Sequence, residues 1–373
     1  MRRFDVLILG AGIVGCACAL ECMRAGLQVG IVERDVPGGA ATAAGMGHIV
    51  VMDDSPAQLS LTRYSRSLWQ ELQPQLPATA EYERRGTVWV AADDEEMAEV
   101  HAKQKIYAAA GVDSQVLDAH ALSIAEPNLR SKLAGGLLVP DDGVIYPPTA
   151  AMFFLQEAIR GGAVLLRGHA AVRIGNGVVT LDDGSMYVAN SIVVATGADT
   201  DLLPWLPIQK RKGHLLITDR YPGFLHHQLV ELGYLKSAHQ LTVDSVAFNI
   251  QPRCTGQLLI GSSRQYGNEN SGADQQILRA MLERARSYMP ALAQVSGIRA
   301  WTGFRAATPD KLPLIGPTDD ATIFLAVGFE GLGITNAPGA ARLLVDSLLQ
   351  RTSQIDAAPF LPARVAHMEI HHA

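Results

Sequence analysis

The chain has 373 residues, 48% of them hydrophobic, a length that predicts two domains or one large domain with an insertion. Its 31 basic and 37 acidic residues give a formal net charge of −6, so the chain lacks the excess of basic residues typical of proteins that bind nucleic acid or an anionic membrane. The four cysteines match neither a zinc nor an iron–sulfur spacing, so we expect reduced thiols, no metal centre and a cytoplasmic protein.

A strand, a glycine-rich turn and a helix open the chain. The apolar run at residues 6–9 leads into Gly10-x-Gly12-x-x-Gly15, and a second strand follows the helix and ends on Glu33. Glycines at these places permit a tight turn, close approach of a pyrophosphate and close helix packing, and an acid about 20 residues later accepts hydrogen bonds from a ribose. The unit therefore predicts a dinucleotide site, with the phosphates at the helix N-terminus.

Two alternatives compete for the same stretch. Arg2 and Arg3 before an apolar run are typical of a secretory signal, but Asp5 and the glycines interrupt that run. A transmembrane helix would need a longer apolar stretch, and Glu21 and Arg24 interrupt it. We therefore expect neither a signal peptide nor a membrane span here.

Strand and helix signals alternate through the rest of the chain. We predict helices at residues 93–110, 149–160, 273–288 and 333–349. Strands are predicted at 87–91, 171–174, 178–181, 186–188, 213–218, 245–251, 257–261 and 323–327. A further buried strand from residue 191 ends in Ala195-Thr196-Gly197, small residues that suit the edge of a cofactor. Taken alone, that segment also fits a plain strand-to-loop junction.

This order of motifs resembles the FAD-dependent D-amino-acid oxidase family, and within it the glycine oxidase, sarcosine oxidase and D-hydroxyproline dehydrogenase branch. The likeness runs from residue 4 to about 350 and is carried by four blocks: residues 10–15 with Glu33, residues 38–46, residues 194–198, and residues 301–316 with 328–333.

The resemblance implies an α/β fold of the glutathione-reductase/D-amino-acid-oxidase type, with a Rossmann-like FAD-binding domain and an α+β substrate domain built on an antiparallel sheet. It implies a discontinuous FAD domain of residues 1–82, 146–205 and 300–373, and a substrate domain of residues 83–145 and 206–299.

The resemblance also implies FAD as the cofactor. We expect non-covalent binding, because the segment that carries the covalent link in sarcosine oxidases has no cysteine here. A helix N-terminus near residue 333 is expected to stabilise negative charge on the reduced flavin. The positions that match cofactor contacts are Gly10, Gly12, Ile13, Val14, Gly15, Glu33, Arg34, Ala41, Thr42, Gly45, Met46, Gly47, His48, Val172, Ala195, Thr196, Gly197, Gly328, Phe329, Glu330, Gly331, Leu332, Gly333, Ile334 and Thr335.

Arg305 stands where the family carries the arginine that pairs with the substrate carboxylate. A guanidinium suits this task because it binds a carboxylate through two parallel hydrogen bonds and stays charged. A surface arginine or a structural ion pair is the alternative. His48, Tyr234 and Gly331 are expected around the substrate pocket, although a packing role fits His48 equally well and an ordinary loop position fits Tyr234.

One departure from the family narrows the expected activity. Glycine oxidase-like enzymes carry Gly-His-x-Arg-Asn-Gly after the last strand, whereas residues 328–333 here read Gly-Phe-Glu-Gly-Leu-Gly, which places Gly331 where a second arginine would stand. This segment is similar to D-hydroxyproline and related imino-acid dehydrogenases. The expected reaction is oxidation of a D-amino or cyclic imino acid to the imine, by hydride transfer from Cα to flavin N5, with D-hydroxyproline or D-proline favoured.

Two alternatives stay open. One is a glycine/sarcosine-type oxidase that produces H2O2, and the other is the flavin subunit of a multi-subunit dye-linked dehydrogenase. The expected partners are a small amino or imino acid and an electron acceptor, which is O2, a quinone or dye, or a partner subunit. A homo- or hetero-oligomer fits either case, as does attachment to a membrane through a partner.

Overall fold

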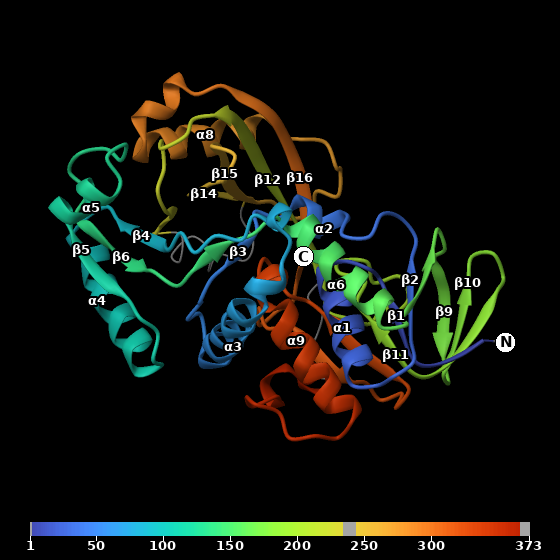
Figure 1. The fold of residues 1–373 in the computed structure, drawn as a ribbon. Helices are drawn as coiled ribbons and strands as arrows, with labels where there is room; N and C mark the ends of the chain where they lie inside the picture. Colours follow the sequence, from blue (N-terminus) through green and yellow to red (C-terminus); the bar gives the residue numbers. More distant parts are fainter. Residues whose placement is uncertain (1, 234–243, 366–373) are drawn as a thin grey trace.

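A computed structural model describes residues 2–233 and 244–365 of the chain. Within these residues the chain forms two eight-stranded sheets and one two-stranded ribbon. Figure 1 shows the two sheets side by side, with the N-terminal and C-terminal segments together around the first sheet.

The first sheet grows from the glycine-rich opening of the chain. Its strands lie in the order β17 (Leu314–Pro317), β18 (Ile323–Val327), β11 (Met186–Val194), β1 (Arg3–Leu9), β2 (Val29–Glu33) and β8 (Val164–Arg167). All neighbours on this path are parallel except β17 and β18. On β1, Val6 and Ile8 pack into one hydrophobic cluster and Leu7 and Leu9 into another, so the strand is buried on both faces, as a parallel sheet requires.

Helices cover one face of this sheet and a β-arm covers the other. The arm consists of β9 (Ala171–Gly175) and β10 (Val178–Leu181), which continues into β11. The helices are α1 (Ile13–Arg24), α6 (Pro147–Arg160), α9 (Gly333–Leu348) and α3 (Pro56–Leu72). Cys16, Cys18 and Cys22 of α1 are fully buried, and this burial raises the pKa of the Cys18 thiol, so they pack as the sequence indicated.

The second sheet is mostly antiparallel. Its strands lie in the order β16 (Gly297–Ala307), β12 (Gln209–Arg220), β15 (Gln257–Arg264), β14 (Ser245–Pro252), β13 (Gln228–Glu231), β4 (Thr87–Ala91), β6 (Gly135–Val139) and β5 (Gln115–Asp118). Only the β13–β4 pair is parallel. The helices packed on it are α4 (Asp94–Ala109), α5 (Ala119–Ala125) and α8 (Gln275–Tyr288).

Several short elements lie outside the two large sheets. They are α2 (Ala40–Ala44), the ribbon of β3 (His48–Ile49) with β7 (Gly143–Val144), and the 3-10 turns η1 (Gln73–Gln75), η2 (Ala78–Ala80), η3 (Pro290–Gln294), η4 (Ala358–Phe360) and η5 (Pro362–Val365). No helix in the described part of the chain combines the length and apolar character needed to cross a bilayer.

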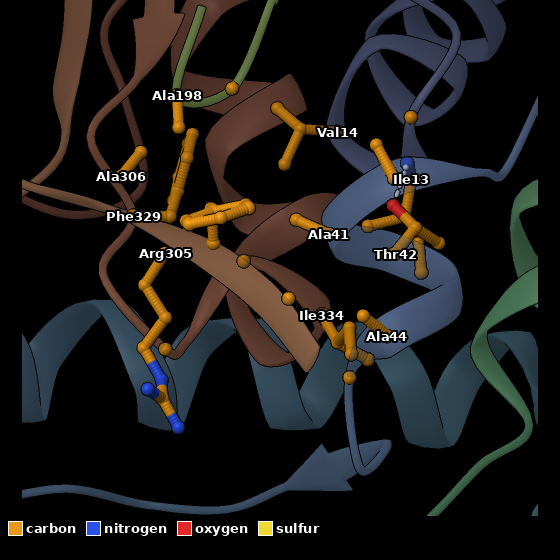
Figure 2. A pocket seen from close by; sticks show the side chains of 18 of the residues that line it. Ile13, Val14, Ala41, Thr42, Ala44, Ala198, Arg305, Ala306, Phe329 and Ile334 are labelled. Atoms are coloured by element: carbon orange, nitrogen blue, oxygen red, sulfur yellow. Dashed lines mark hydrogen bonds between the residues drawn. The ribbon is translucent and has the colours of Figure 1, made fainter. Parts of the chain in front are cut away.

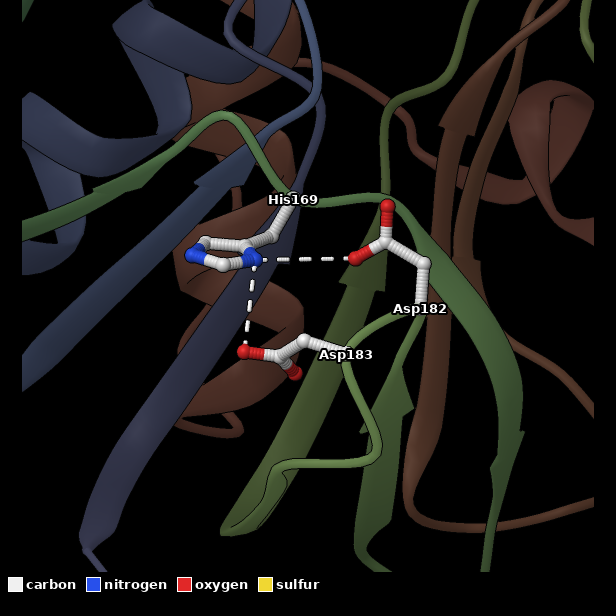
Figure 3. A group of neighbouring side chains, drawn as sticks. All are labelled: His169, Asp182 and Asp183. Carbon is white, nitrogen blue, oxygen red and sulfur yellow. Dashed lines mark ion pairs between the residues drawn. The ribbon is translucent and has the colours of Figure 1, made fainter.

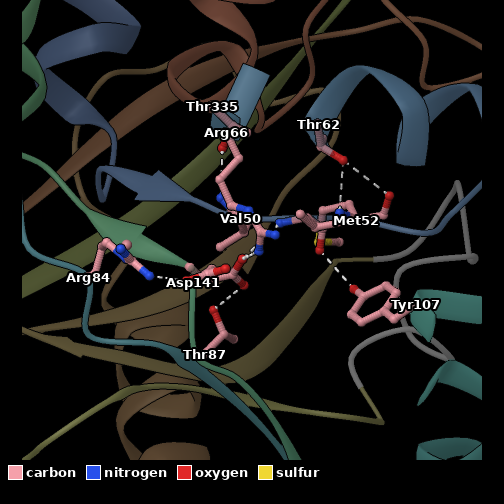
Figure 4. A network of polar contacts seen from close by, with 12 residues as sticks. Val50, Met52, Thr62, Arg66, Arg84, Thr87, Tyr107, Asp141 and Thr335 are labelled. Atoms are coloured by element: carbon pink, nitrogen blue, oxygen red, sulfur yellow. Dashed lines mark hydrogen bonds and ion pairs between the residues drawn. The ribbon is translucent and has the colours of Figure 1, made fainter. Parts of the chain in front are cut away.

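A buried polar network holds the joint between the sheets (Figure 4). Arg66 of α3 donates to Asp142 Oδ1 at 2.9 Å, and Thr87 of β4 donates to Asp142 Oδ2 at 2.6 Å. Asp142 is fully buried, and the loss of water raises the pKa of its carboxyl to about 6. The network therefore ties α3, beside the first sheet, to the second sheet.

Most predicted elements are present, with informative differences. The separate strand signals at 186–188 and from residue 191 form one strand, β11, because it pairs with β1 from Arg3↔Val188 to Leu9↔Val194. Helix α3 was not predicted, although Ser55 caps it by accepting from Gln58 N at 3.1 Å and a proline occupies its first position.

The domain boundary predicted at residue 300 falls inside β16. This strand pairs with β12 along its whole length, from Gln209↔Ala307 to Thr218↔Gly297, so its two halves belong to one sheet. We therefore propose the same two discontinuous domains with the last boundary placed after β16.

Candidate active site

A cavity of about 1020 Å³ lies where the glycine-rich turn of the first sheet faces the second sheet. This volume exceeds the range of roughly 300–1,000 Å³ that is usual for one small ligand. Figure 2 shows Ile13, Val14 and Thr42 on one side of the cavity and Arg305, Ala306 and Phe329 on the other. The residues expected to contact a cofactor that line it are Gly10, Gly12, Ile13, Val14, Glu33, Arg34, Ala41, Thr42, Gly45, Met46, Gly47, His48, Val172, Ala195, Thr196, Gly197, Gly328, Phe329, Glu330, Gly331, Leu332, Gly333 and Ile334.

Gly15 and Thr335 were expected at the cofactor but do not line the cavity. A Cβ on Gly15 would lie 2.0 Å from Gly10 O, so this glycine lets α1 pack against the turn from behind. The Thr335 hydroxyl donates to His48 O at 2.8 Å and fixes the strand behind the cavity wall. Tyr234 lies outside the described residues.

Besides the short helix α2, two longer helices begin at the cavity without a side-chain cap from their own N-cap residue. Helix α1 has Gly12 at its N-cap and α9 has Leu332, and both residues line the cavity. At α1, the Ile13 amide donates instead to Thr42 Oγ1 at 3.0 Å, which ties the helix to the following loop. Free N–H groups and the positive end of the helix dipole suit an anion, so these ends fit a pyrophosphate and a reduced flavin ring.

Glu33 holds the turn at the end of β2. Its Oε2 accepts from Ala11 N at 2.7 Å and its Oε1 accepts from Asp35 N at 2.8 Å. Each carboxylate oxygen has a second lone pair, so the group can accept from ribose hydroxyls while keeping both backbone bonds. The structure thus gives Glu33 a loop-ordering role that the motif alone did not indicate.

His48 lies in the cavity wall and is half-buried, with its Nε2 atom fully buried. Burial lowers the pKa of its imidazole to about 4, so the ring is neutral at physiological pH. Next to it, Gln251 Nε2 donates to Met46 O at 2.6 Å and anchors the loop that leads into β3. A neutral ring here can donate or accept a hydrogen bond without placing a positive charge beside the cofactor.

Glu330 enters the cavity wall as half of an ion pair with Arg211. The arginine, on β12, is only 2% exposed and also donates to the Tyr266 hydroxyl at 3.0 Å. Glu330 adopts a left-handed backbone conformation, with φ +53°, at the turn before α9. The pair keeps the Glu330 charge from standing alone beside a cofactor, and Arg211 was not identified from the sequence.

Arg305 projects into the cavity from β16, where the sequence predicted a substrate anchor. Its Nη1 donates to Ser263 O at 3.0 Å, so the side chain crosses β12 to reach β15. Further residues of the second sheet line the cavity and were not identified from the sequence, among them Trp89, Asn249, Ser262 and Arg264. Ser262 and Arg264 are two residues apart on β15, and in a strand this spacing places both side chains on the same face of the sheet. This spacing is the signal from which the sequence could have placed them together.

One group of side chains has a spacing that could hold a metal ion within the described residues (Figure 3). His169 Nδ1 lies 3.5 Å from both Asp182 Oδ1 and Asp183 Oδ2, at the tip of the β-arm. All three side chains are more than a third exposed, and exposed acidic groups of this kind are common without a bound ion. We assign no metal to them.

Comparison with known proteins agrees with this geometry. The sequence pattern of the family described as FAD dependent oxidoreductase matches residues 5–347. The chain is 26% identical to a Geobacillus kaustophilus glycine oxidase, covering 96% of each protein. It is also 26% identical to the hydrogen cyanide synthase subunit HcnC of Pseudomonas aeruginosa, covering 97% of this chain and 96% of that subunit.

Solved structures show the same fold. The crystal structure of glycine oxidase from Geobacillus kaustophilus superposes with a TM-score of 0.86 at 24% identity, covering 97% of this chain and 98% of that one. The structure of L-proline dehydrogenase from P. horikoshii gives a TM-score of 0.85 at 22% identity, covering 97% and 98%.

Proposed function

Because this chain belongs to the family of FAD-dependent oxidoreductases, we propose that it oxidises the Cα–N bond of a D-amino or cyclic imino acid, with D-hydroxyproline or D-proline favoured. The observation that carries the proposal is Arg305 in the wall of the cofactor cavity, held by Ser263 O. Relatives named glycine oxidase and D-amino acid dehydrogenase support an amino-acid substrate.

The described residues divide between holding FAD and holding the substrate. The turn at Gly10–Gly12 and the α1 N-terminus would take the pyrophosphate, Glu33 the ribose, and the α9 N-terminus one edge of the flavin. When bound, FAD supplies the acceptor for the hydride that leaves the substrate Cα. The chain itself supplies position and electrostatics, and no strong general base is required if the substrate amine enters neutral.

Arg305 would orient the substrate by pairing with its carboxylate. A bidentate pair fixes the direction of Cα, and a desolvated wall strengthens the attraction. His48 is neutral, so it can share a hydrogen bond with the neutral substrate nitrogen without adding a charge beside it. Gly331 faces the stem of Arg305, since a Cβ there would lie 3.5 Å from Arg305 Nε, and it adds no side chain to the cavity.

The room beside Gly331 supports a ring-bearing substrate. Each buried methylene contributes about 0.8 kcal/mol, so the three ring methylenes of proline would contribute roughly 2.4 kcal/mol more than glycine can. That difference corresponds to about 60-fold in kcat/KM. A glycine-type oxidase is the second candidate, favoured by the relatives named glycine oxidase, and a subunit of a larger enzyme is the third, favoured by the relative named as a subunit.

Steady-state kinetics with a defined panel separates these candidates. The FAD-loaded protein is assayed with both enantiomers of proline and hydroxyproline, with glycine and with sarcosine, using either an artificial dye or O2 as acceptor. We expect the D-configured ring substrates to have at least 10-fold higher kcat/KM than glycine, and the dye to outperform O2. Comparable kcat/KM for glycine, with stoichiometric H2O2, would instead identify a glycine-type oxidase.

A further inference from the structure

The side chain of Arg305 lies across Gly213 of the neighbouring strand. In the β12–β16 pair, Gly213 stands opposite Gly303, so Arg305 is its diagonal neighbour on the same face of the sheet. Both Gly213 and Arg305 line the cavity. The guanidinium continues over β12 until Nη1 reaches Ser263 O on β15, at 3.0 Å.

No side chain at position 213 is compatible with this path. A Cβ built on Gly213 would lie 2.5 Å from Arg305 Nη1 and 2.8 Å from both Cζ and Nη2. Nη1 and Nη2 carry N–H groups of the kind that bind a carboxylate. The backbone of Gly213 is not in the left-handed region, so alanine fits the strand itself and only the guanidinium would have to move.

Gly331, on the other side of Arg305, provides a contrast. A Cβ there would lie 3.5 Å from Arg305 Nε and 3.6 Å from Cδ, which is ordinary van der Waals contact with the stem. The two glycines therefore differ in their effect on the arginine, because an added methyl at position 213 displaces its head and one at position 331 only touches its stem.

We propose that Gly213 is a positioning residue for the substrate carboxylate, acting through Arg305. Because Gly213 has no side chain, the guanidinium can lie across the strand at this point and keep Nη1 on Ser263 O in the cavity wall. This inference rests on the proposed carboxylate-binding role of Arg305 but not on which amino or imino acid is oxidised.

The size of the effect follows from the displacement. To restore ordinary contact at 3.4 Å, the guanidinium of a Gly213→Ala protein must shift by about 1 Å. Misplacement of about 1 Å in a positioning group can lower the rate about 100-fold. We expect this loss in kcat/KM for carboxylate substrates, together with unchanged FAD content and unchanged or slightly raised thermal stability.

The test combines a double-mutant cycle with a binding measurement on the FAD-loaded protein. The variants are Gly213→Ala, Arg305→Ala and both together, each compared with the unmodified protein. The binding probes are pyrrole-2-carboxylate and its neutral carboxamide, each followed by the change it causes in the flavin absorption spectrum. The carboxylate probe reports on the anchor even if the true substrate differs from the one proposed.

The expected result is loss of carboxylate binding in Gly213→Ala with little change for the carboxamide, which serves as the control. In the Arg305→Ala background, Gly213→Ala should have no further effect, because the group it displaces is gone. Equal losses for both probes, or losses that add in the double variant, would overturn the positioning role while leaving the proposed function standing. Absence of carboxylate binding in the unmodified protein would overturn both.

Discussion

Replacing Glu33 with alanine should raise the Kd for FAD, and the contacts of Glu33 allow the size of the increase to be calculated. The carboxylate already accepts from Ala11 N and Asp35 N at 2.7 and 2.8 Å, so removing it frees both ends of the turn that would contact the dinucleotide. A hydrogen bond to a charged group contributes about 1.5–3 kcal/mol. Loss of the ribose contact alone should therefore raise the Kd for FAD about 10- to 150-fold, with loop disorder adding to it.

The assay is titration of the apoprotein with FAD, followed by the change in flavin fluorescence. Asp35→Ala is the control, because Asp35 lines the same cavity but its side chain is 76% exposed and forms a surface ion pair with Arg34. Such pairs contribute little, so the control should change Kd less than threefold. Circular dichroism checks that both apoproteins fold. An unchanged Kd in folded Glu33→Ala would refute the role we assign to the carboxylate.

Three more predictions address the cofactor, His48 and Arg305. Acid precipitation should release all of the FAD, and colour retained in the pellet would contradict non-covalent binding. The His48 pKa falls from 6.5 to about 4 on folding, so the unfolded state binds more protons than the folded state between these pH values. The contribution of His48 to the free energy of unfolding is therefore fully present above about pH 6.5 and is lost as the pH falls toward 4. His48→Asn should therefore reduce the slope of unfolding free energy against pH in that window by up to about 1.4 kcal/mol per pH unit, whereas identical slopes would contradict a neutral buried imidazole. Arg305→Lys should raise KM steeply for carboxylate substrates at constant FAD content, because an ammonium cannot form the bidentate pair, and near-native kcat/KM would mean that Arg305 is structural.

The parts of the site that were predictable are those built from neighbouring residues. The turn at Gly10–Gly12, the start of α1 and the position of Glu33 all belong to one strand–helix–strand unit, so spacing along the chain determines their geometry. The end of strand β11 at Val194 was predictable for the same reason, since the apolar run that leads to it is continuous.

The parts that were not predictable depend on pairing between distant segments. Strand β4 pairs with β13 through Trp89↔Val230, and no local pattern at either strand indicates the other. The ion pair of Arg211 with Glu330 joins residues more than a hundred positions apart. Likewise, the sequence aligned Arg305 with the arginine that pairs with the substrate carboxylate in the family, but no local pattern indicated that its side chain would lie over Gly213.

The most direct test of the central claim is anaerobic reduction of the bound flavin by a single added substrate. We expect D-proline or D-hydroxyproline to bleach the flavin absorbance of the isolated protein within seconds, and we expect the Arg305→Ala protein, loaded with the same amount of FAD, to bleach at least 100-fold more slowly at the same concentration. A flavin that no amino or imino acid reduces, or that both proteins reduce at the same rate, would contradict the account.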